Sequence, residues 1–378
     1  MIDALSILQD LIRCPSVTPE AAGVFDVLEA ALVPLGFAVT RLTFAGDGSY
    51  PVDNLFATRG TSGPHLLYAG HTDVVPPGDA ALWTHPPFGA EIADGLIYGR
   101  GAADMKSSIA AFIAAVARAE MGSGTISLAI TNDEEADSIN GTEKLMAWAD
   151  AQGHRFDFAI VGEPSATLRV GDSIKIGRRG SLNGRITVTG TQGHVAYPDK
   201  ANNPLPVAAG LVTALSGKLD DGTEHFPPSN LEFTSMDVGN AATNVIPATA
   251  TLRFNIRYND RWTPESLTEA VEQVLDNHDK QGCTVALEVM GRPSRAFLSP
   301  LGEGVETLIA CIARQSNTPP ELSTGGGTSD ARFIAAYCPV VECGLPGASM
   351  HKADEHVRIA DIEALTALYA AFLADYLG

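Results

Sequence analysis

The chain has 378 residues, of which 45% are hydrophobic and 19% charged, a composition that supports a folded protein with a sizeable core. Its 25 basic and 45 acidic side chains give a formal net charge of −20, which disfavours binding to nucleic acid or to an anionic membrane surface. No apolar run approaches the ~18 residues of a membrane span, and the amino terminus lacks the basic start of a secretion signal. Five cysteines without a CxxC pair indicate unpaired thiols, so we expect a cytoplasmic protein.

The first half of the chain alternates helical and strand-like segments. Apolar residues recur at helical spacing over 3–13 and 106–120. Short apolar runs at 64–69, 125–130 and 156–162 predict buried strands. This alternation predicts an α/β layer architecture with a largely parallel sheet.

The pattern changes near residue 180. The segments that follow are, in chain order, a strand at 182–190, a helix at 204–218, strands at 230–238 and 249–258, a helix at 264–278 and a strand at 283–290. The order β-α-β-β-α-β is the split βαβ pattern of a ferredoxin-like, two-layer α+β domain. Beyond it, a helical stretch returns after Pro293, then a strand at 339–344 and a closing helix from 361.

We therefore expect a catalytic domain that is interrupted by an inserted domain. The expected boundaries are 1–179 for the first part of the catalytic domain, 180–292 for the insertion and 293–378 for the second part. Both crossings lie near segments containing Pro, Gly or Arg, which suits a chain that passes from one domain to another.

Five segments place side chains that bind metals just after predicted strands or turns, where open α/β sheets build their sites. They are AGHTDVV with His71 and Asp73, GRGAADMKSS with Asp104, TNDEEADS with Glu134 and Glu135, IVGEPS with Glu163, and SMHKADEHV with His351. Each alone has an ordinary explanation, such as a helix N-cap for Asp104. As candidate ligands they supply two imidazoles, His71 and His351, and three carboxylates, Asp104, Glu135 and Glu163, a mixture that suits zinc or cobalt better than calcium or magnesium.

The spacing within two of these motifs indicates different roles for the two residues of each pair. His71 and Asp73 are two apart and point the same way on an extended segment, where a carboxylate can fix the tautomer of a ligating histidine. Glu134 and Glu135 are adjacent and diverge, so one can bind a metal while the other approaches a water molecule. Two metals that share one carboxylate need about five protein ligands, and cations would offset the repulsion among the carboxylates.

The motifs GHTDVVPPGD, YGRGAADMK, TNDEEAD, VGEP and MHKADE, in this order around an insertion, resemble the dinuclear-zinc aminoacylase/carboxypeptidase family. The resemblance covers nearly the whole chain. It implies a zinc-peptidase-like α/β catalytic domain with a mixed, largely parallel sheet, interrupted by a ferredoxin-like α+β dimerisation or lid domain. It also implies two divalent metal ions per subunit, zinc with cobalt as the alternative. Asp104 would bridge them, with His71 and Glu163 completing one site and Glu135 and His351 the other.

The same resemblance implies roles for residues beside the metals. Asp73 would be the partner of His71, and Glu134 would be the general base that takes a proton from the bridging water and delivers it to the leaving amine. From the inserted domain, His194 would reach the partner subunit's active site and stabilise the oxyanion, acting with Asn244 across the dimer. A homodimer is therefore expected.

The segments KIGRRGSLNGRITVTGTQGHVAYPDKANNP and GGTSDARF narrow the resemblance to members that hydrolyse the amide of a succinylated diamino acid. Such a small anionic substrate carries three carboxylates and one ammonium. Arg178, Arg179 and Arg257 are the candidate partners of these carboxylates, because a guanidinium binds a carboxylate through two hydrogen bonds. Four further residues match positions that line the substrate pocket of these members: Ser181, Tyr197, Gly327 and Thr328.

Two alternative interpretations share part of this pattern. Another amidase of the family, such as an acetylornithine deacetylase or an aminoacylase, would keep the metal-binding residues and differ in its pocket. A non-catalytic protein could keep the fold as a dimeric metal-binding module. Such a protein would be expected to lose the general base or a ligand, and here all of these positions are present.

Overall fold

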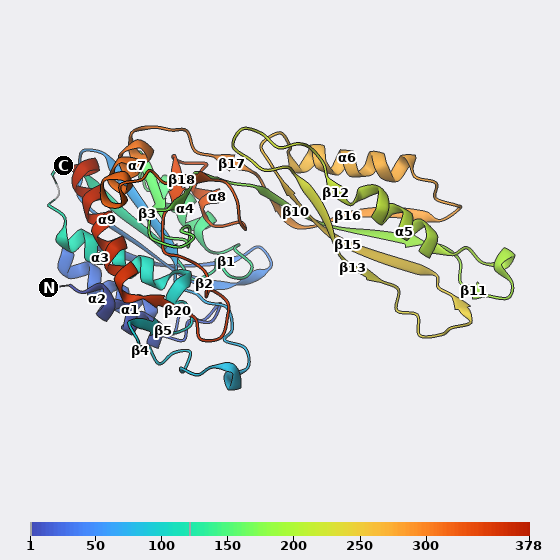
Figure 1. Cartoon of the computed structure of the whole chain (residues 1–378), viewed down its shortest axis with the longest axis horizontal. Helices are drawn as coiled ribbons and strands as arrows, with labels where there is room; N and C mark the ends of the chain where they lie inside the picture. Colours follow the sequence, from blue (N-terminus) through green and yellow to red (C-terminus); the bar gives the residue numbers. More distant parts are fainter. Residues whose placement is uncertain (1, 121) are drawn as a thin grey trace. The chain divides into compact units, whose positions relative to one another are not determined.

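The computed structural model of the chain describes residues 2–120 and 122–378, which form two compact units (Figure 1). The first unit runs to Ile176 and continues over Ser299–Ser323 and Ser329–Gly378, and the second comprises Gly177–Leu298 and Thr324–Thr328. From the sequence we predicted that the inserted domain begins at residue 180 and that the catalytic domain resumes at 293. In the structure, the second unit begins at Gly177 and the first unit resumes at Ser299. Among the described residues, no helix combines the length and the apolar character needed to cross a membrane.

An eight-stranded mixed sheet forms the centre of the first unit. Its strands, in spatial order, are β1 (Ala38–Gly46), β2 (Ser49–Arg59), β6 (Thr125–Thr131), β3 (His65–His71), β7 (Phe158–Val161), β19 (Val340–Glu342), β8 (Ser173–Lys175) and β18 (Glu321–Ser323). The neighbours from β6 to β19 are parallel, and nearly all of their residues are buried, as is typical of parallel strands covered on both faces. The expected mixed, largely parallel sheet is confirmed.

The first unit also contains helices. They are α1 (Ala4–Arg13), α2 (Val24–Leu32), α3 (Ser107–Arg118), α4 (Thr142–Ala151), α7 (Glu303–Ser316), α8 (Ala331–Ile334) and α9 (Ile359–Leu377), with short 3-10 segments η1 (Val33–Leu35) and η2 (Ala80–Leu82). Helix α3 follows a π turn, η3 (Ala102–Lys106), and is almost entirely buried. A helix that is apolar all round needs cover on every side, and α9 lies alongside α3 to provide part of it (Figure 1).

A small three-stranded sheet brings together two segments that carry predicted ligands. It consists of β4 (Glu91–Ala93), β5 (Leu96–Tyr98) and β20 (His356–Arg358), with β5 in the middle. His356 pairs with Tyr98 in this sheet. The chain that leads into Asp104 therefore lies beside the chain that leaves His351.

The second unit is a five-stranded antiparallel sheet with two helices. The strands, in spatial order, are β12 (Gly217–Lys218), β13 (Asn230–Asp237), β15 (Thr249–Tyr258), β10 (Gly180–Thr189) and β16 (Thr284–Ser294), and the helices are α5 (Pro204–Leu215) and α6 (Pro264–Asn277). Alternate residues of β10 and β15 are buried with apolar residues of both helices in one core. The predicted ferredoxin-like order of elements is present.

Each helix of the second unit begins at a capping residue followed by proline. The Asn203 side chain accepts a hydrogen bond from Leu205 N, and Thr263 forms a capping box with Ser266. Two small ladders complete the unit: β9 (Gly177–Arg178) with β17 (Phe297–Leu298), and β11 (Gly193–His194) with β14 (Val245–Ile246). A 3-10 segment, η4 (Pro198–Lys200), follows β11.

Candidate metal centre

The predicted metal ligands of the first unit come from separate segments that meet at one edge of the sheet. His71 ends β3, Glu163 follows β7, and Glu135 follows β6, so all three lie at the carboxyl ends of parallel strands. Asp104 lies in η3, and His351 lies in the loop before β20. The shared direction of the parallel strands brings His71, Glu135 and Glu163 together. The pairing of β5 with β20 brings the segments of Asp104 and His351 close to each other.

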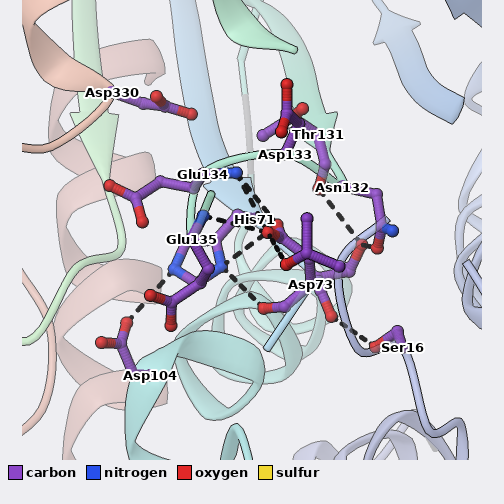
Figure 2. A network of polar contacts seen from close by, with 12 residues as sticks. Ser16, His71, Asp73, Asp104, Thr131, Asn132, Asp133, Glu134, Glu135 and Asp330 are labelled. Carbon is purple, nitrogen blue, oxygen red and sulfur yellow. Dashed lines mark hydrogen bonds and ion pairs between the residues drawn. The ribbon is translucent and has the colours of Figure 1, made fainter. Parts of the chain in front are cut away.

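The nitrogen and oxygen atoms of this group lie close to one another, and Figure 2 shows His71, Asp104 and Glu135 among them. His71 Nε2 is 3.2 Å from Asp104 Oδ1 and 3.5 Å from Glu163 Oε1. His351 Nε2 is 3.4 Å from Asp104 Oδ2 and 3.1 Å from Glu135 Oε1. Asp104 therefore faces one histidine with each of its carboxylate oxygens, as a bridging ligand must.

Two sets of three ligand atoms lie within 4.8 Å of one another. One set is His71, Asp104 and Glu135, and the other is His71, Glu134 and Glu163. The second set brings the predicted base, Glu134, to the same cluster as the ligands. Nitrogen and carboxylate donors at this spacing are those that zinc and similar divalent ions take.

The electrostatics of the cluster favour bound cations. Burial raises the pKa of Glu134 and of Glu163 well above the usual value, and the charge of Asp104 adds to the effect. Hydrogen bonds to Asp104 and Glu135 raise the pKa of His351 to about 10. Divalent cations would offset the negative charge of the carboxylates with both imidazoles neutral and able to coordinate. The donor set fits divalent metal ions.

Asp73 organises the segment that carries both glutamates (Figure 2). Its buried carboxylate accepts hydrogen bonds from the backbone N–H of Glu134 at 3.1 Å, the backbone N–H of Glu135 at 3.0 Å and Thr18 Oγ1 at 2.8 Å. His71 Nδ1 lies 2.9 Å from the backbone oxygen of Asp73 and 3.6 Å from its carboxylate. The carbonyl therefore accepts the Nδ1 proton, which leaves His71 Nε2 facing Asp104.

Sequence reasoning missed one further anchor of the glutamate segment, Asp133, and one of the helix that follows it, Asp330. The carboxylate of Asp133 accepts hydrogen bonds from Tyr50 Oη at 2.7 Å and from two backbone N–H groups later in the segment. Asp330 accepts a hydrogen bond from Thr142 Oγ1 at 2.6 Å, at the first residue of α4. Both aspartates occur in motifs noted above, TNDEEAD and GGTSDARF, but neither motif indicates their partners.

Lys106 is a third residue that the sequence did not single out. Its side chain is fully buried, and Nζ donates hydrogen bonds to the backbone oxygens of Leu11 at 2.9 Å and Cys14 at 3.0 Å. Burial lowers the pKa of this ammonium group to about 8. The contacts satisfy carbonyl groups at the end of α1 and tie that helix to the turn that carries Asp104.

In the second unit, the structure brings together three of the predicted residues. His194 lies in β11 and pairs with Val245, next to Asn244. The backbone N–H of Val195 donates a hydrogen bond to the backbone oxygen of Asn244 at 3.1 Å, and the ring of Tyr197 lies 5.8 Å from that of His194. The side chains of His194, Tyr197 and Asn244 are exposed.

The three predicted arginines differ in their surroundings. Arg178 is 8% exposed, and its Nη1 donates hydrogen bonds of 3.1 Å to the backbone oxygens of Gly325 and Gly327. The guanidinium therefore shapes the glycine-rich loop that contains Gly327 and precedes Thr328.

Arg179 and Arg257 lie together at one end of the second sheet. Arg179 Nη1 donates to Asn230 Oδ1 at 3.2 Å, and Asn230 pairs with Arg257 across β13 and β15. Ser181 pairs with Arg257 on the other side, across β10 and β15. Both arginines and Ser181 are partly exposed and are brought together through Asn230 and the strand pairing, and we call these residues the arginine cluster.

Carboxylates and imidazoles gathered at the carboxyl ends of a parallel sheet, beside a glutamate that can act as a base, define a metal-dependent hydrolase. The chain belongs to peptidase family M20/M25/M40, whose model matches residues 67–375. It is 53% identical to a succinyl-diaminopimelate desuccinylase of Rhodopseudomonas palustris (strain BisA53), over 99% of this chain and 98% of that relative. It is 52% identical to a protein of the same name from Bradyrhizobium sp. (strain BTAi1), with both chains fully covered.

Solved structures share the fold at low identity. An aminopeptidase PepT from Bacillus cereus superposes with a TM-score of 0.82 at 19% identity, covering 99% of this chain and 98% of that one. The YXEP protein of Bacillus subtilis, described as a dinuclear metal-binding peptidase of the M20 family, superposes with a TM-score of 0.70 at 15% identity, covering 99% and 97%. The expected family, fold class and hydrolase assignment are thereby confirmed.

Proposed function

We propose that the protein is a desuccinylase that hydrolyses N-succinyl-L,L-2,6-diaminopimelate to succinate and L,L-diaminopimelate. This step belongs to lysine and cell-wall precursor synthesis in bacteria. The observation that carries the proposal is the 53% identity, over 99% of the chain, to a relative of that name. The cluster around Asp104 supplies the matching chemistry, because amide hydrolysis needs both an activated water and a stabilised oxyanion.

The ligands proposed for two metal ions are the five residues of the cluster. Asp104 would bridge the ions, with His71 and Glu163 on one side and Glu135 and His351 on the other. Zinc suits this donor set, and cobalt accepts the same ligands. When bound, the metal ions polarise the amide carbonyl and lower the pKa of a water molecule.

Glu134 moves the proton in the proposed reaction. It takes a proton from the attacking water as the C–O bond forms, and delivers it to the amide nitrogen as the C–N bond breaks. Its carboxyl group lies in the same set of ligand atoms as His71 and Glu163, which supports this role. Asp73 holds the backbone of Glu134 and so directs this carboxyl group.

The second unit would recognise the substrate. Arg179 and Arg257 are proposed to bind substrate carboxylates, with Ser181 beside them, because these partly exposed residues are brought together through Asn230 and the pairing of β10, β13 and β15. Arg178 would act through the loop that presents Gly327 and Thr328. His194, with Tyr197 and Asn244, is proposed to stabilise the oxyanion in the site of the partner subunit.

We further propose that the protein acts as a homodimer in the cytoplasm. Strand β13 supports dimer formation, because β12 pairs only with its first two residues, Asn230 and Leu231. Within the described part of the chain, no strand pairs with that side of the rest of β13. Such an edge favours pairing with a second chain.

A substrate panel tests the proposed function. The metal-loaded full chain would be given N-succinyl-L,L-diaminopimelate, N-acetylornithine and an N-acyl neutral amino acid, and amide cleavage would be followed. We expect kcat/KM to be highest for the succinylated substrate by orders of magnitude. Preference for N-acetylornithine would assign the protein to another amidase activity of the family. Metal binding without cleavage of any amide would contradict an enzymatic role.

A further inference from the structure

A buried carboxylate outside the ligand set, that of Glu355, connects the two loops that carry Asp104 and His351. Glu355 is 1% exposed. Four donors from the Asp104 loop converge on its two oxygens: Arg100 Nη1 at 2.7 Å and Gly101 N at 3.1 Å on Oε2, and Ala103 N at 2.8 Å and Asp104 N at 3.2 Å on Oε1. Each oxygen already accepts two hydrogen bonds, so Glu355 is suited to hold backbone rather than to coordinate a metal.

The same residue is fixed to the loop of His351. Ser349 closes this loop, because its Oγ donates to the backbone oxygen of His356 at 2.6 Å and accepts from His356 N at 3.1 Å. Glu355 lies inside the closed segment, and its backbone oxygen accepts a hydrogen bond from Gly99 N at 2.8 Å. The Glu355 backbone thus belongs to one loop while its side chain is bound by the other.

Arg100 strengthens this connection. It is 2% exposed, and its Nη1 lies 3.3 Å from the backbone oxygen of Lys352 as well as 2.7 Å from Glu355. A buried carboxylate is stable only when charges and donors compensate it, and this one has a guanidinium and three backbone N–H groups. Removing any of these groups would leave the others unpaired in the interior, so the arrangement resists displacement.

We propose that Glu355, held by Arg100, is a positioning residue that sets the separation between Asp104 and His351 and thereby the affinity of the cluster for metal ions. The inference rests on the proposed metal binding. Asp104 N is one of the four donors, so a shift of Glu355 moves the backbone of the bridging ligand. His351 lies in the same closed loop as Glu355, so the distance of 3.4 Å between His351 Nε2 and Asp104 Oδ2 depends on this contact.

Metal titration of the full chain tests the inference. Metal-free wild-type protein and the variants Glu355→Gln, Glu355→Asp and Glu363→Gln would be titrated with Zn²⁺ against a competing chelator. Glu355→Gln places an amide NH₂ among four donors, and Glu355→Asp keeps the charge on a shorter side chain. Glu363→Gln is the matched control, because Glu363 also pairs with an arginine, accepting two hydrogen bonds from Arg118, but lies exposed on α9.

We expect both Glu355 variants to bind metal about 10- to 100-fold more weakly, as is usual when a residue that orients ligands is changed. The Glu363 control should stay within about twofold of the wild type, in line with the small effect of an exposed ion pair. The visible spectrum of Co²⁺-loaded Glu355→Asp should also differ from that of the wild type, because ligand geometry sets it. A role in stability alone would leave this spectrum unchanged.

Wild-type affinity and an unchanged Co²⁺ spectrum in Glu355→Asp would overturn the inference, and this variant decides the matter if Glu355→Gln does not fold. A wild-type chain that binds no metal would overturn the proposed function, and the inference with it. The two failures are therefore distinguishable.

Discussion

At the scale of single residues, Asp73 links the ligands to the base. Its backbone oxygen orients His71, and its carboxylate holds the backbone N–H groups of Glu134 and Glu135. Asp73 therefore fixes the position of His71, at the end of β3, relative to the segment after β6 that carries the two glutamates. The carboxylate acts on the glutamate segment more directly than on His71, whose Nδ1 it approaches only to 3.6 Å.

Replacing Asp73 by Asn should weaken metal binding about 10- to 100-fold, the usual effect of losing a group that orients ligands. The amide NH₂ of Asn would face the N–H donors of Glu134 and Glu135. Competitive metal titration measures the change. Asp53→Asn is the matched control, because Asp53 also accepts a hydrogen bond from a threonine hydroxyl, that of Thr43, but on the exposed hairpin. Equal affinities in the two variants would contradict the role of Asp73.

Glu134→Gln should lower kcat by about 10²- to 10⁴-fold, because an amide cannot accept the proton of the attacking water. Metal content per chain should remain that of the wild type, since Glu134 is not among the proposed ligands. Turnover and metal analysis of the same preparation measure both quantities. Glu303→Gln, at an exposed position of α7, is the control. Wild-type turnover in Glu134→Gln would remove Glu134 from its role.

The ligand residues and Asp73 could be predicted from the sequence, whereas the other residues that hold the ligands could not. His71 ends an apolar strand and Glu163 follows another closely, a local signal that one sequence window contains. Lys106 and Glu355 act on backbone groups 95 and up to 254 positions away, respectively. No local pattern encodes such contacts, because they exist only after the loops have been folded together.

At the scale of elements, close packing behind the strand ends fixes the direction of the ligands. Gly162 lies between β7 and Glu163, and a Cβ added there would lie 2.1 Å from Tyr68 Oη and 2.7 Å from Met105 Cε. Strand β7, strand β3 and the turn η3 therefore approach one another as closely as only glycine permits. The site depends on this packing as well as on its polar contacts.

Gly162→Ala should destabilise the protein by about 1–3 kcal/mol, the usual cost of forcing an extra methyl group into a packed interior. It should also weaken metal binding, because Glu163 follows directly. Thermal unfolding and metal titration measure the two effects. Gly302→Ala is the control, since a Cβ at Gly302 meets no atom within 4 Å. Unchanged unfolding and affinity in Gly162→Ala would contradict the packing argument.

Asp220, in a turn of the second unit, should make the stability of the protein depend on pH in the acid range. Burial alone would raise the pKa of Asp220, but hydrogen bonds, among them those from Trp262 Nε1 and Ser229 N, lower it to about 2. Because this folded-state pKa lies below the unfolded one, near 4, the stabilisation is present above about pH 4 and is lost as the pH falls toward 2. After allowance for solvent screening we expect a loss of about 1 kcal/mol.

Unfolding measured between pH 5 and pH 2 tests this expectation. Wild-type protein should lose the contribution of Asp220 across this range, whereas Asp220→Asn should lack that part of the pH dependence. Asp221→Asn, at the exposed neighbouring position, is the control and should follow the wild type. Parallel curves for wild type and Asp220→Asn would contradict the argument.

The order of most elements could be predicted, because their apolar periodicity is local. The buried strands β3, β6 and β7, the helix α3 and the whole β-α-β-β-α-β series of the second unit agree with the sequence patterns. The antiparallel hairpin of β1 and β2 was not predicted. All residues of β1 are exposed or only partly buried, so this strand lacks the apolar run that marks the central ones.

At the scale of the whole molecule, the two units have different sheets and different proposed roles, metal binding in the first and substrate recognition in the second. The first holds the cluster of carboxylates and histidines, and the second holds the arginine cluster and the segment of His194. A net charge of −20 makes local cations necessary for any anionic substrate. Bound metal ions and the guanidinium groups would supply them.

The dependence of succinate release on bound metal tests this account most directly. Protein stripped with a chelator would be reloaded with increasing Zn²⁺, and metal per chain and hydrolysis of N-succinyl-L,L-diaminopimelate would be measured on the same samples. We predict no succinate from the stripped chain, and activity that rises with occupancy until two ions are bound per chain. Undiminished release by stripped protein, or none at full occupancy, would contradict the account.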